Sequence, residues 1–304
     1  MATNANTVPQ QVMDEIIMGL AGQADPVIDQ IPGIQAFKMD ALSGKVPVLP
    51  SSSTMSNVTD ADAEGLPEGA EPNESEIQWS EISYDNRRYP GYTTITDGVA
   101  QAVSRGEYTG LEICMLRAKM DCAAKLNKKL NLLLKNATVN EVQAVANGAW
   151  SVETSTPILD MQAAQRKVGG KPNIGIFGDD VLKALQVHGD FLARTSNYEA
   201  GFVDEAEIAE QLRRAFGLRY VVVGGQLYNA GPEGTPFALG FEFDGVAWLG
   251  RVEHLVKTET NKNSPNVEQD RNLRREATET IYSRRMDIRR SHKECGVIIT
   301  GVSA

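Results

Sequence analysis

Residues 170–194 read GKPNIGIFGDDVLKALQVHGDFLAR. Their pattern predicts a short buried strand at 173–177, a turn at Gly178, and a helix that opens with Asp179 and Asp180. Units of this kind hold the phosphate of a nucleotide in many proteins, because the free N–H groups at a helix N-terminus attract anions. The stretch therefore raises two alternatives, a nucleotide site or a helix that simply packs on a sheet.

The glycines and aspartates of this turn favour the second alternative. A dinucleotide fingerprint has three glycines in the order G-x-G-x-x-G, whereas only Gly175 and Gly178 are present here and Gly175 lies within the strand. Asp179 and Asp180 also place negative charge where a phosphate would sit, and this charge would repel it. We therefore expect no nucleotide at this turn.

The composition is that of a globular chain that can bury a sizeable core. The chain has 304 residues, of which 41% are hydrophobic, enough for one large domain or two ordinary ones. No apolar run is long enough to span a membrane, and the first residues lack the basic start and apolar run of a signal peptide. The odd number of cysteines predicts free, buried thiols in a reducing compartment. They are Cys114, Cys122 and Cys295.

The charge is concentrated in the first quarter of the chain. Residues 1–80 contain 12 of the 40 acidic side chains and only 2 of the 30 basic ones. This quarter carries the whole formal charge of −10, and residues 81–304 are neutral with 28 charges of each sign. An acidic chain of this kind is a poor candidate for tight, sequence-specific binding of DNA.

The first part of the chain reads as an arm, a long loop and a long helix. Residues 1–44 hold one amphipathic stretch and are interpreted as an N-terminal arm. Residues 45–78 are acidic and rich in turn formers, and residues 77–95 alternate like the return strand of a long hairpin. Residues 107–135 contain no proline and repeat apolar side chains at helical spacing. This spacing predicts a helix of up to about 40 Å at ~1.5 Å per residue.

The remainder of the chain predicts alternating helices and strands. Besides the helix that follows Gly178, helices are expected at 157–168 and 204–216. Strands are expected at 149–153, 218–225, 236–241 and 245–252, and as long strands between 274 and 302.

Motifs of known chemistry are absent from the sequence. It has no G-x-x-x-x-G-K-[ST] phosphate loop and no G-x-S-x-G nucleophile elbow. His188, His254 and His292 lack the spacing of zinc ligands, so separate structural roles are expected for them. Cys114 and Cys122, eight positions apart, are interpreted as small core residues. We therefore expect no catalytic residue, no cofactor-binding residue and no metal ligand.

One basic cluster near the C-terminus has two interpretations. It would contact nucleic acid through phosphates without reading bases, or it would form ion pairs with carboxylates of this or a neighbouring chain. Basic runs usually form solvated or paired faces, which favours ion pairing. The cluster consists of Arg284, Arg285, Arg289, Arg290, His292 and Lys293. The nearby carboxylates are Glu276, Glu279, Asp287 and Glu294.

In order and spacing, these elements resemble the major capsid proteins of tailed bacteriophages, which have the Hong-Kong-97-type shell fold. The resemblance covers nearly the whole chain and is most specific between 157 and 229. In that family a helix is followed by a strand with a Pro-Asn start, a helix ending in L…H…AR, a further helix, and a V-x-V-G strand followed by Tyr-Asn. The matching residues are Pro172-Asn173, Leu185, His188, Ala193-Arg194, Val221, Gly224 and Tyr228-Asn229.

The resemblance implies an α+β fold without enzymatic activity. The parts that it implies are an N-terminal arm at 1–44, an E-loop hairpin at 45–95 that reaches over a neighbouring subunit, a peripheral domain at 96–150 with a long spine helix, an axial domain at about 151–245, and strands at 246–304 that return to the peripheral domain.

The resemblance also implies a function and its partners. The chain would be a major capsid protein that self-assembles as hexamers and pentamers into an icosahedral shell around double-stranded DNA, which it would contact non-specifically. Scaffold, portal and decoration proteins would be further partners, and no membrane would take part. The shell would form in the cytoplasm of the host bacterium and become the capsid of the virion. Three alternatives stay open: an encapsulin-type nanocompartment shell, a nucleotide-dependent α/β enzyme, and a DNA-binding protein.

Overall fold

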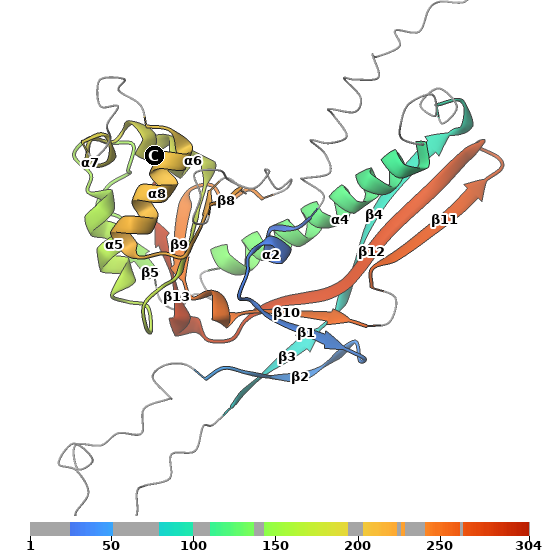
Figure 1. Cartoon of the computed structure of the whole chain (residues 1–304), viewed down its shortest axis with the longest axis horizontal. Helices are drawn as coiled ribbons and strands as arrows, with labels where there is room; N and C mark the ends of the chain where they lie inside the picture. Colours follow the sequence, from blue (N-terminus) through green and yellow to red (C-terminus); the bar gives the residue numbers. More distant parts are fainter. Residues whose placement is uncertain are drawn as a thin grey trace, which may run out of the picture.

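The computed structural model describes residues 25–50, 79–99, 110–136, 143–193, 203–223, 226–228, 241–261 and 264–303. They form two connected parts, which are a six-stranded sheet with helices and an elongated ribbon of strands with one long helix (Figure 1). A two-stranded hairpin lies beside the ribbon. No helix of the described residues is long and apolar enough to cross a membrane.

The six-stranded sheet is buried through most of its width. In order, its strands are β5 (Gln143–Val145), β13 (Gly296–Thr300), β9 (Val246–Gly250), β6 (Ile174–Phe177), β7 (Tyr220–Val223) and β8 (Gln226–Tyr228). β6 pairs with β7 in parallel and with β9 in antiparallel orientation. Every residue of β6 and β7 is buried, which is why both segments are continuous apolar runs in the sequence.

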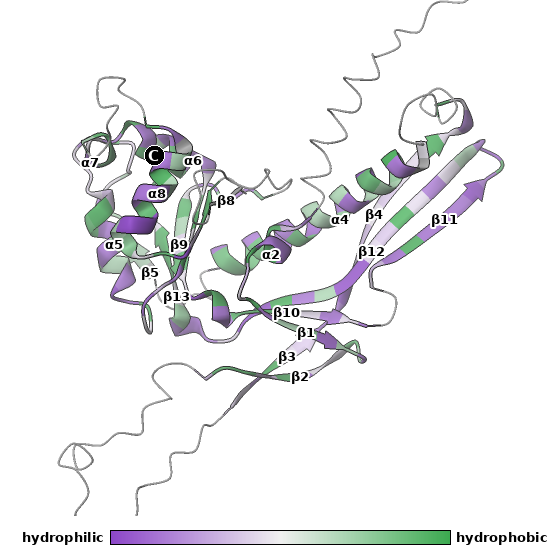
Figure 2. Ribbon diagram, in the orientation of Figure 1, coloured by the Kyte–Doolittle hydropathy of each residue, from purple (hydrophilic) through white to green (hydrophobic). Residues whose placement is uncertain are grey.

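Helices cover one face of this sheet, and the N-terminal segment and the ribbon helix cover the other (Figure 1). The first set consists of α5 (Pro157–Gln165), α6 (Asp179–Val187) and α8 (Glu205–Phe216), and the second of α2 (Val27–Gln30) and the end of α4 (Gly110–Lys135). Phe177 and Val221 pack toward the first set, whereas Ile176 and Trp248 pack toward the second. This part therefore has hydrophobic core on both faces (Figure 2).

The strand–turn–helix unit predicted at 170–194 is present, but its helix is interrupted. α6 ends at Val187, and a short helix, α7 (Gly189–Leu192), follows. His188 between them has an extended backbone, and its ring accepts a hydrogen bond from the Asp190 amide. The expectation of one continuous helix is therefore wrong, because His188 ends α6 and caps the next helix.

Gly178 serves packing in this unit. A Cβ atom at this position would lie 2.1 Å from the carbonyl oxygen of Phe243, so the close approach of the two segments requires glycine. The Asp180 carboxylate accepts a hydrogen bond from the Gly245 amide at 2.9 Å. Asp179 forms an exposed ion pair with Lys183 at 2.5 Å. The turn thus uses its glycine and both aspartates within the protein itself.

The ribbon is an elongated sheet whose central strand is β12 (Ala277–Arg290). Its neighbours are β10 (Leu255–Thr260) and β11 (Asn266–Asn272) along one edge and β4 (Arg87–Thr96) along the other, and β1 (Gln35–Met39) pairs with β10. α4 lies along β4 and β12 (Figure 1). This is the long helix that the sequence predicts at 107–135, and its described part begins at Gly110.

The contact between α4 and β4 is closest at Gly91. A Cβ atom there would lie 1.7 Å from the carbonyl oxygen of Ala118, so a side chain at this position would push the helix away from the strand. Beside this point, the thiol of Cys122 donates to the Tyr89 carbonyl oxygen at 3.0 Å. All three cysteines are buried and free, as the sequence predicts.

The hairpin consists of β2 (Ser43–Val48) and β3 (Ser80–Asp85). Val46, Val48 and Tyr84 pack on Val256 of β10, which attaches the hairpin to the ribbon. Residues 51–78, between its strands, and residues 1–24 of the predicted arm lie outside the described residues. The return strand predicted at 77–95 is divided between β3 and β4, since the chain passes from one sheet to the other at Asn86.

Several other expectations differ from the structure. The strand expected at 149–153 is a turn, in which the indole N–H of Trp150 donates to Asp160 at 2.9 Å, and the strand of this region is β5. β1, within the predicted arm, and β10 and β11 have no counterpart among the predicted strands. The strand expected at 236–241 falls on residues that are not described, apart from Phe241, which is not in a strand.

Candidate functional site

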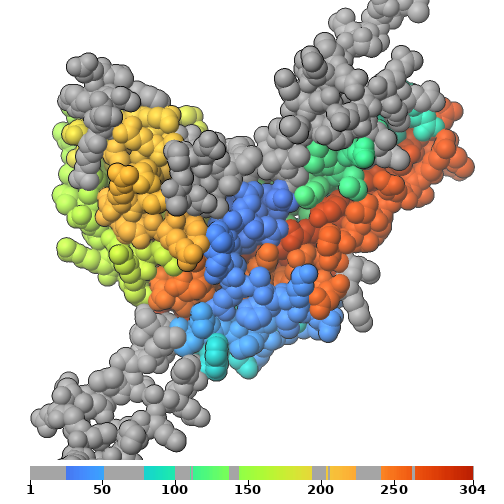
Figure 3. Space-filling view, viewed as in Figure 1, coloured from blue at the N-terminus to red at the C-terminus, as the bar shows by residue number. Residues whose placement is uncertain are grey.

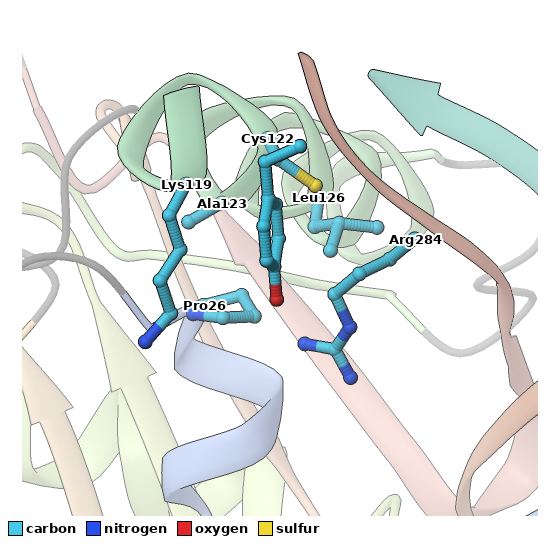
Figure 4. Close-up of a pocket in the computed structure, with 7 residues that line it drawn as sticks. Pro26, Lys119, Cys122, Ala123, Leu126 and Arg284 are labelled. Carbon is cyan, nitrogen blue, oxygen red and sulfur yellow. The ribbon is translucent and has the colours of Figure 1, made fainter. Parts of the chain in front are cut away.

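Three hollows in the described part of the chain bear on whether it has a small-molecule site. A cavity of about 10 Å³ lies where α4 crosses β12 (Figure 4), which is room for about one water. A hollow of about 270 Å³ is lined by residues that include Trp150, Glu153, His188 and Leu192. An open groove of about 460 Å³ is lined by Gln162, Gln165, Arg166 and Lys171. Among the described residues, no three His, Cys, Asp or Glu side chains are placed to hold a metal ion.

The cavity at the α4 crossing has no activated group. Figure 4 shows Lys119 and Arg284 on opposite sides of it, with the sulfur of Cys122 near its wall. Burial raises the pKa of the Cys122 thiol to about 11, so the thiol is protonated at neutral pH and is a poor nucleophile. The cavity is therefore a small gap in the packing of the crossing.

A partly buried ion cluster fastens the N-terminal segment to the ribbon. The guanidinium of Arg284 pairs with Asp29 of α2 and, at 3.0 Å, with Glu259 of β10. Lys257 also pairs with Asp29, at 2.6 Å. Figure 3 shows residues 25–50, in blue, seated between the two parts of the molecule. The cluster explains this position, because α2 is tied to two ribbon strands at once.

The electrostatics of the cluster follow from burial and charge together. Burial alone would raise the pKa of the Asp29 carboxyl, but the charge of Arg284 and hydrogen bonds from Arg284 and Lys257 lower it below its usual value. Burial would likewise raise the pKa of Glu259, but the hydrogen bond and the charge of Arg284 outweigh it and lower this pKa below its usual value. Arg284 keeps its proton, and its pKa is raised by these two carboxylates against the effect of burial.

Arg289 and Arg290 of the basic cluster are also engaged within the chain. Arg289 pairs with Asp287 at 2.6 Å. Arg290 is 8% exposed, and it donates to the carbonyl oxygens of His292 and Gly296 at 2.9 and 3.0 Å. Burial lowers the pKa of Arg290 to about 10. Ion pairing with Asp287 was among the sequence predictions, whereas the pairing of Arg284 with Asp29 and Glu259 was not.

A polar network joins the hairpin to the ribbon where β3 ends. The side-chain amide of Asn86, which is buried, donates to Thr260 at 3.2 Å and accepts from Thr258 at 2.7 Å. The Asp287 carboxylate accepts from the Asp85 amide at 3.0 Å. Sequence reasoning does not single out Asn86, because a lone asparagine within the strand predicted at 77–95 has no motif that marks it as a buried connector.

The structure brings two of the three histidines together. The rings of His254 and His292 have centroids 5.4 Å apart, so the expectation of separate roles is wrong for this pair. His188 lies elsewhere and contacts the Ser155 hydroxyl at 3.2 Å. No third ligand of the described residues joins the pair to make a metal site.

Apolar side chains are exposed on the ribbon and beside the hairpin. At the turn between β11 and β12, Leu273 is 77% exposed, and it is followed by Arg274 and Arg275, which are also exposed. Trp79, just before β3, is 60% exposed.

Comparison with solved structures gives the same fold. A phage-related protein from Bordetella bronchiseptica is 13% identical, with a TM-score of 0.63 over 94% of this chain and 97% of that one. A chain of the procapsid of satellite phage P4 is 10% identical, with a TM-score of 0.52 over 96% and 100%. A chain of the capsid of cyanophage P-SCSP1u is 10% identical, with a TM-score of 0.51 over 89% and 87%. No family model matches the sequence, and no curated protein matches it.

The chain has the Hong-Kong-97-type capsid fold. The predicted fold class, an α+β capsid fold, is thereby confirmed. In this capsid fold the unit at 170–194 is part of a packed α/β layer. At its glycine turn, Gly178 packs against Phe243, Asp179 pairs with Lys183, and Asp180 accepts from the Gly245 amide.

Proposed function

We propose that the chain is a major capsid protein, which self-assembles as hexamers and pentamers into an icosahedral shell around double-stranded DNA. The observation that carries the proposal is the capsid fold itself, in which a core region is joined to a projecting ribbon and hairpin (Figure 1). The strands β11 and β2 are largely exposed within one chain, so neighbouring chains of a symmetric assembly are suited to cover them.

We further propose the division of the chain that the resemblance implies. The arm would be 1–44, the E-loop hairpin 45–95, the peripheral domain with its spine helix 96–150, the axial domain about 151–245, and the returning strands 246–304. Two contacts support the roots of the projecting parts, since Asp29 and Asn86 fasten the arm and the hairpin to the ribbon.

The proposed mechanism is conformational, and no residue has a catalytic, cofactor-binding or metal-binding role in it. A contact of about 4 kcal/mol corresponds to a Kd of about 1 mM, so two subunits alone would associate weakly. A closed symmetric shell repeats such contacts many times, and the particle as a whole is then stable. Scaffold, portal and decoration proteins are proposed partners, as is the packaged DNA, which would be contacted without base specificity.

Sedimentation of the purified protein at micromolar concentration, followed by electron microscopy of the fractions, tests the proposal. We expect capsomers, closed shells, or sheets and tubes. A protein that stays monomeric under all assembly conditions, including added scaffold protein, would overturn it. The contents of particles isolated from cells decide between a DNA-filled capsid and a nanocompartment, because the latter would hold a cargo enzyme and no DNA.

Deleting residues 51–74 tests the proposed role of the hairpin. The deletion leaves β2 and β3 in place, so the variant should unfold at the same denaturant concentration as the unmodified protein but fail to form stable shells. A control variant with the same number of residues replaced by a Gly/Ser linker separates loop length from loop sequence. Normal particles from the deletion variant would refute the role.

A further inference from the structure

At the end of the hairpin where Val48 pairs with Ser80, a histidine fastens the chain to the rest of the protein. The Nε2 atom of His292 lies 2.9 Å from the carbonyl oxygen of Leu49, the residue that follows β2. A carbonyl oxygen only accepts hydrogen bonds, so the Nε2 atom carries a proton and donates it. The position of Leu49 thus depends on where this imidazole ring lies.

His292 is held in place by a second histidine. The ring of His254 meets it edge-on, at an interplanar angle of 74°. His254 Nδ1 contacts the Ser291 hydroxyl at 2.7 Å, and the Ser291 amide donates to the His254 carbonyl oxygen at 2.9 Å. The 3₁₀ turn η3 (Val252–His254) and the turn that follows β12 are therefore joined, and Leu49 is attached to this unit.

The surroundings of the two rings are rich in positive charge. The charged and titratable groups around them are Arg251, Glu253, Arg290, Lys293, Glu294 and the Cys295 thiol. The carboxylate of Glu253 is already engaged by the Arg251 guanidinium at 2.6 Å and the Asn173 amide at 2.7 Å. A proton added to the His254 ring would therefore meet more repulsion than attraction.

We propose that the contact between His254 and His292 is an acid-sensitive joint, which holds the Val48 end of the β2–β3 hairpin while His254 is uncharged and releases it when His254 takes up a proton. A charged His254 ring would lie out of water beside Arg251 and Arg290, so it must reach solvent to keep its proton. His254 is 2% exposed and His292, which contacts it, is only partly buried, so exposing His254 separates the two rings. The hydrogen bond of His292 to Leu49 is then lost.

The direction and size of the response follow from proton linkage. Burial, followed by the charges of Arg251 and His292, lowers the pKa of His254 from 6.5 to about 4. Opening restores the ordinary value, so the closed joint is fully favoured above pH 6.5 and is weakened as the pH falls toward 4. Between pH 8 and pH 5, the ratio of open to closed joint should rise about 30-fold.

The joint lies within one chain, so it goes beyond the proposed assembly function and is tested on unassembled subunits. The measurement is amide hydrogen exchange of peptides that cover residues 43–50, at pH 8 and pH 5, corrected for the intrinsic pH dependence of exchange. Exchange in the unmodified protein should become about 30-fold faster at pH 5 relative to the corrected value at pH 8. An unchanged corrected rate would overturn the joint.

Three variants sharpen this test. His254→Phe keeps an aromatic edge against His292 but takes up no proton, so it should lose most of the acid response. His254→Gln can still form a hydrogen bond with the Ser291 hydroxyl without titrating, so it should stay protected at both pH values. His188→Gln, at a histidine far from the joint in the fold, is the matched control and should respond like the unmodified protein.

The two variants at the joint decide independently. A full acid response in His254→Phe would overturn the proposal. If circular dichroism shows that His254→Phe is unfolded, His254→Gln decides alone, and a 30-fold response in that variant would likewise overturn the proposal.

Discussion

The six-stranded sheet and the ribbon bury their strands to different extents. In the sheet, β6 and β7 are buried at every residue, since other elements cover both faces. In the ribbon, α4 covers one face of β4 and β12, and β11 is exposed at most of its positions. Figure 2 shows the matching difference in hydropathy: β11 is largely hydrophilic, whereas the strands of the six-stranded sheet are hydrophobic.

This difference separates two properties of the chain. The sheet and its helices hold most of the buried apolar side chains, so they determine the free energy of unfolding of a single subunit. The ribbon contributes a small cluster around Cys122, Leu126 and Met286, and its strand β11 is exposed at most positions. Substitutions in the two regions should therefore change different measured quantities.

The largest effect on unfolding is expected from Phe177→Ala in the sheet. Phe177 is fully buried between β6 and the helices, and truncating a buried phenylalanine costs about 3–5 kcal/mol. Urea unfolding followed by circular dichroism measures it. Leu159→Ala on the outer side of α5, where the side chain is 60% exposed, is the control and should change the free energy by less than about 0.5 kcal/mol. A loss below about 1 kcal/mol for Phe177→Ala would contradict the description of this core.

A smaller loss is expected from Gly91→Ala in the ribbon. The new methyl group would lie 1.7 Å from the Ala118 carbonyl oxygen, so α4 must shift, at a cost of about 3 kcal/mol. Gly98→Ala is the matched control, since nothing lies within 4 Å of a Cβ atom at that position. Equal unfolding midpoints for the two variants would show that α4 does not press on β4 at this point.

The sequence predicts the parts of the fold whose hydrophobic pattern is complete in itself. α4, α8, β6, β7, β9 and β13 all coincide with apolar runs or helical repeats, because packing within one layer dictates their residues. β10 (LVKTET) and β11 (NVEQDRN) are too polar to be recognised alone. They are strands because the long β12 pairs with both of them, and such pairing depends on residues distant in sequence.

The polar connections at the junction could not be predicted for a related reason. Asp29 and Arg284 are 255 positions apart, and each is unremarkable among the residues beside it. The basic run at 284–293 indicated that carboxylates would be nearby, but only the folded chain shows that α2 supplies one of them. The His254–His292 contact likewise has no signature in the spacing of the sequence.

Asp29→Asn tests this connection and its pH dependence. The variant keeps the shape of the side chain but loses its charge toward Arg284 and Lys257, and hydrogen bonds to charged groups contribute about 1.5–3 kcal/mol. Because Glu259 still pairs with Arg284, we expect a loss of about 1.5 kcal/mol at pH 7.

The folded-state pKa of Asp29 is lowered from 3.8, so its contribution is present above that pH and fades as the pH falls through the lower, folded value. The two proteins should therefore become more alike in strong acid, as measured by urea unfolding at each pH. Asp270→Asn, at an exposed carboxylate of β11, is the control and should cost nothing measurable. A difference between Asp29→Asn and the unmodified protein that persists unchanged in acid would refute the assignment.

The smallest effect on unfolding, and the clearest test of the comparison, is expected from Leu273→Ser. Leu273 is 77% exposed at the ribbon tip and Leu159 is 60% exposed on α5, so the same change at either position should alter the free energy of unfolding by less than about 0.5 kcal/mol.

If the ribbon is completed by neighbouring chains, Leu273→Ser removes an apolar contact at every repeat of the interface. A loss of ~1.4 kcal/mol per contact is tenfold in a single association constant, and a closed shell multiplies it. Sedimentation at a fixed subunit concentration should then show far fewer shells for Leu273→Ser than for Leu159→Ser. Equal shell yields from these two variants would mean that the ribbon tip makes no contact that assembly needs, and that the exposed ribbon does not differ in this respect from the outer surface of the sheet region.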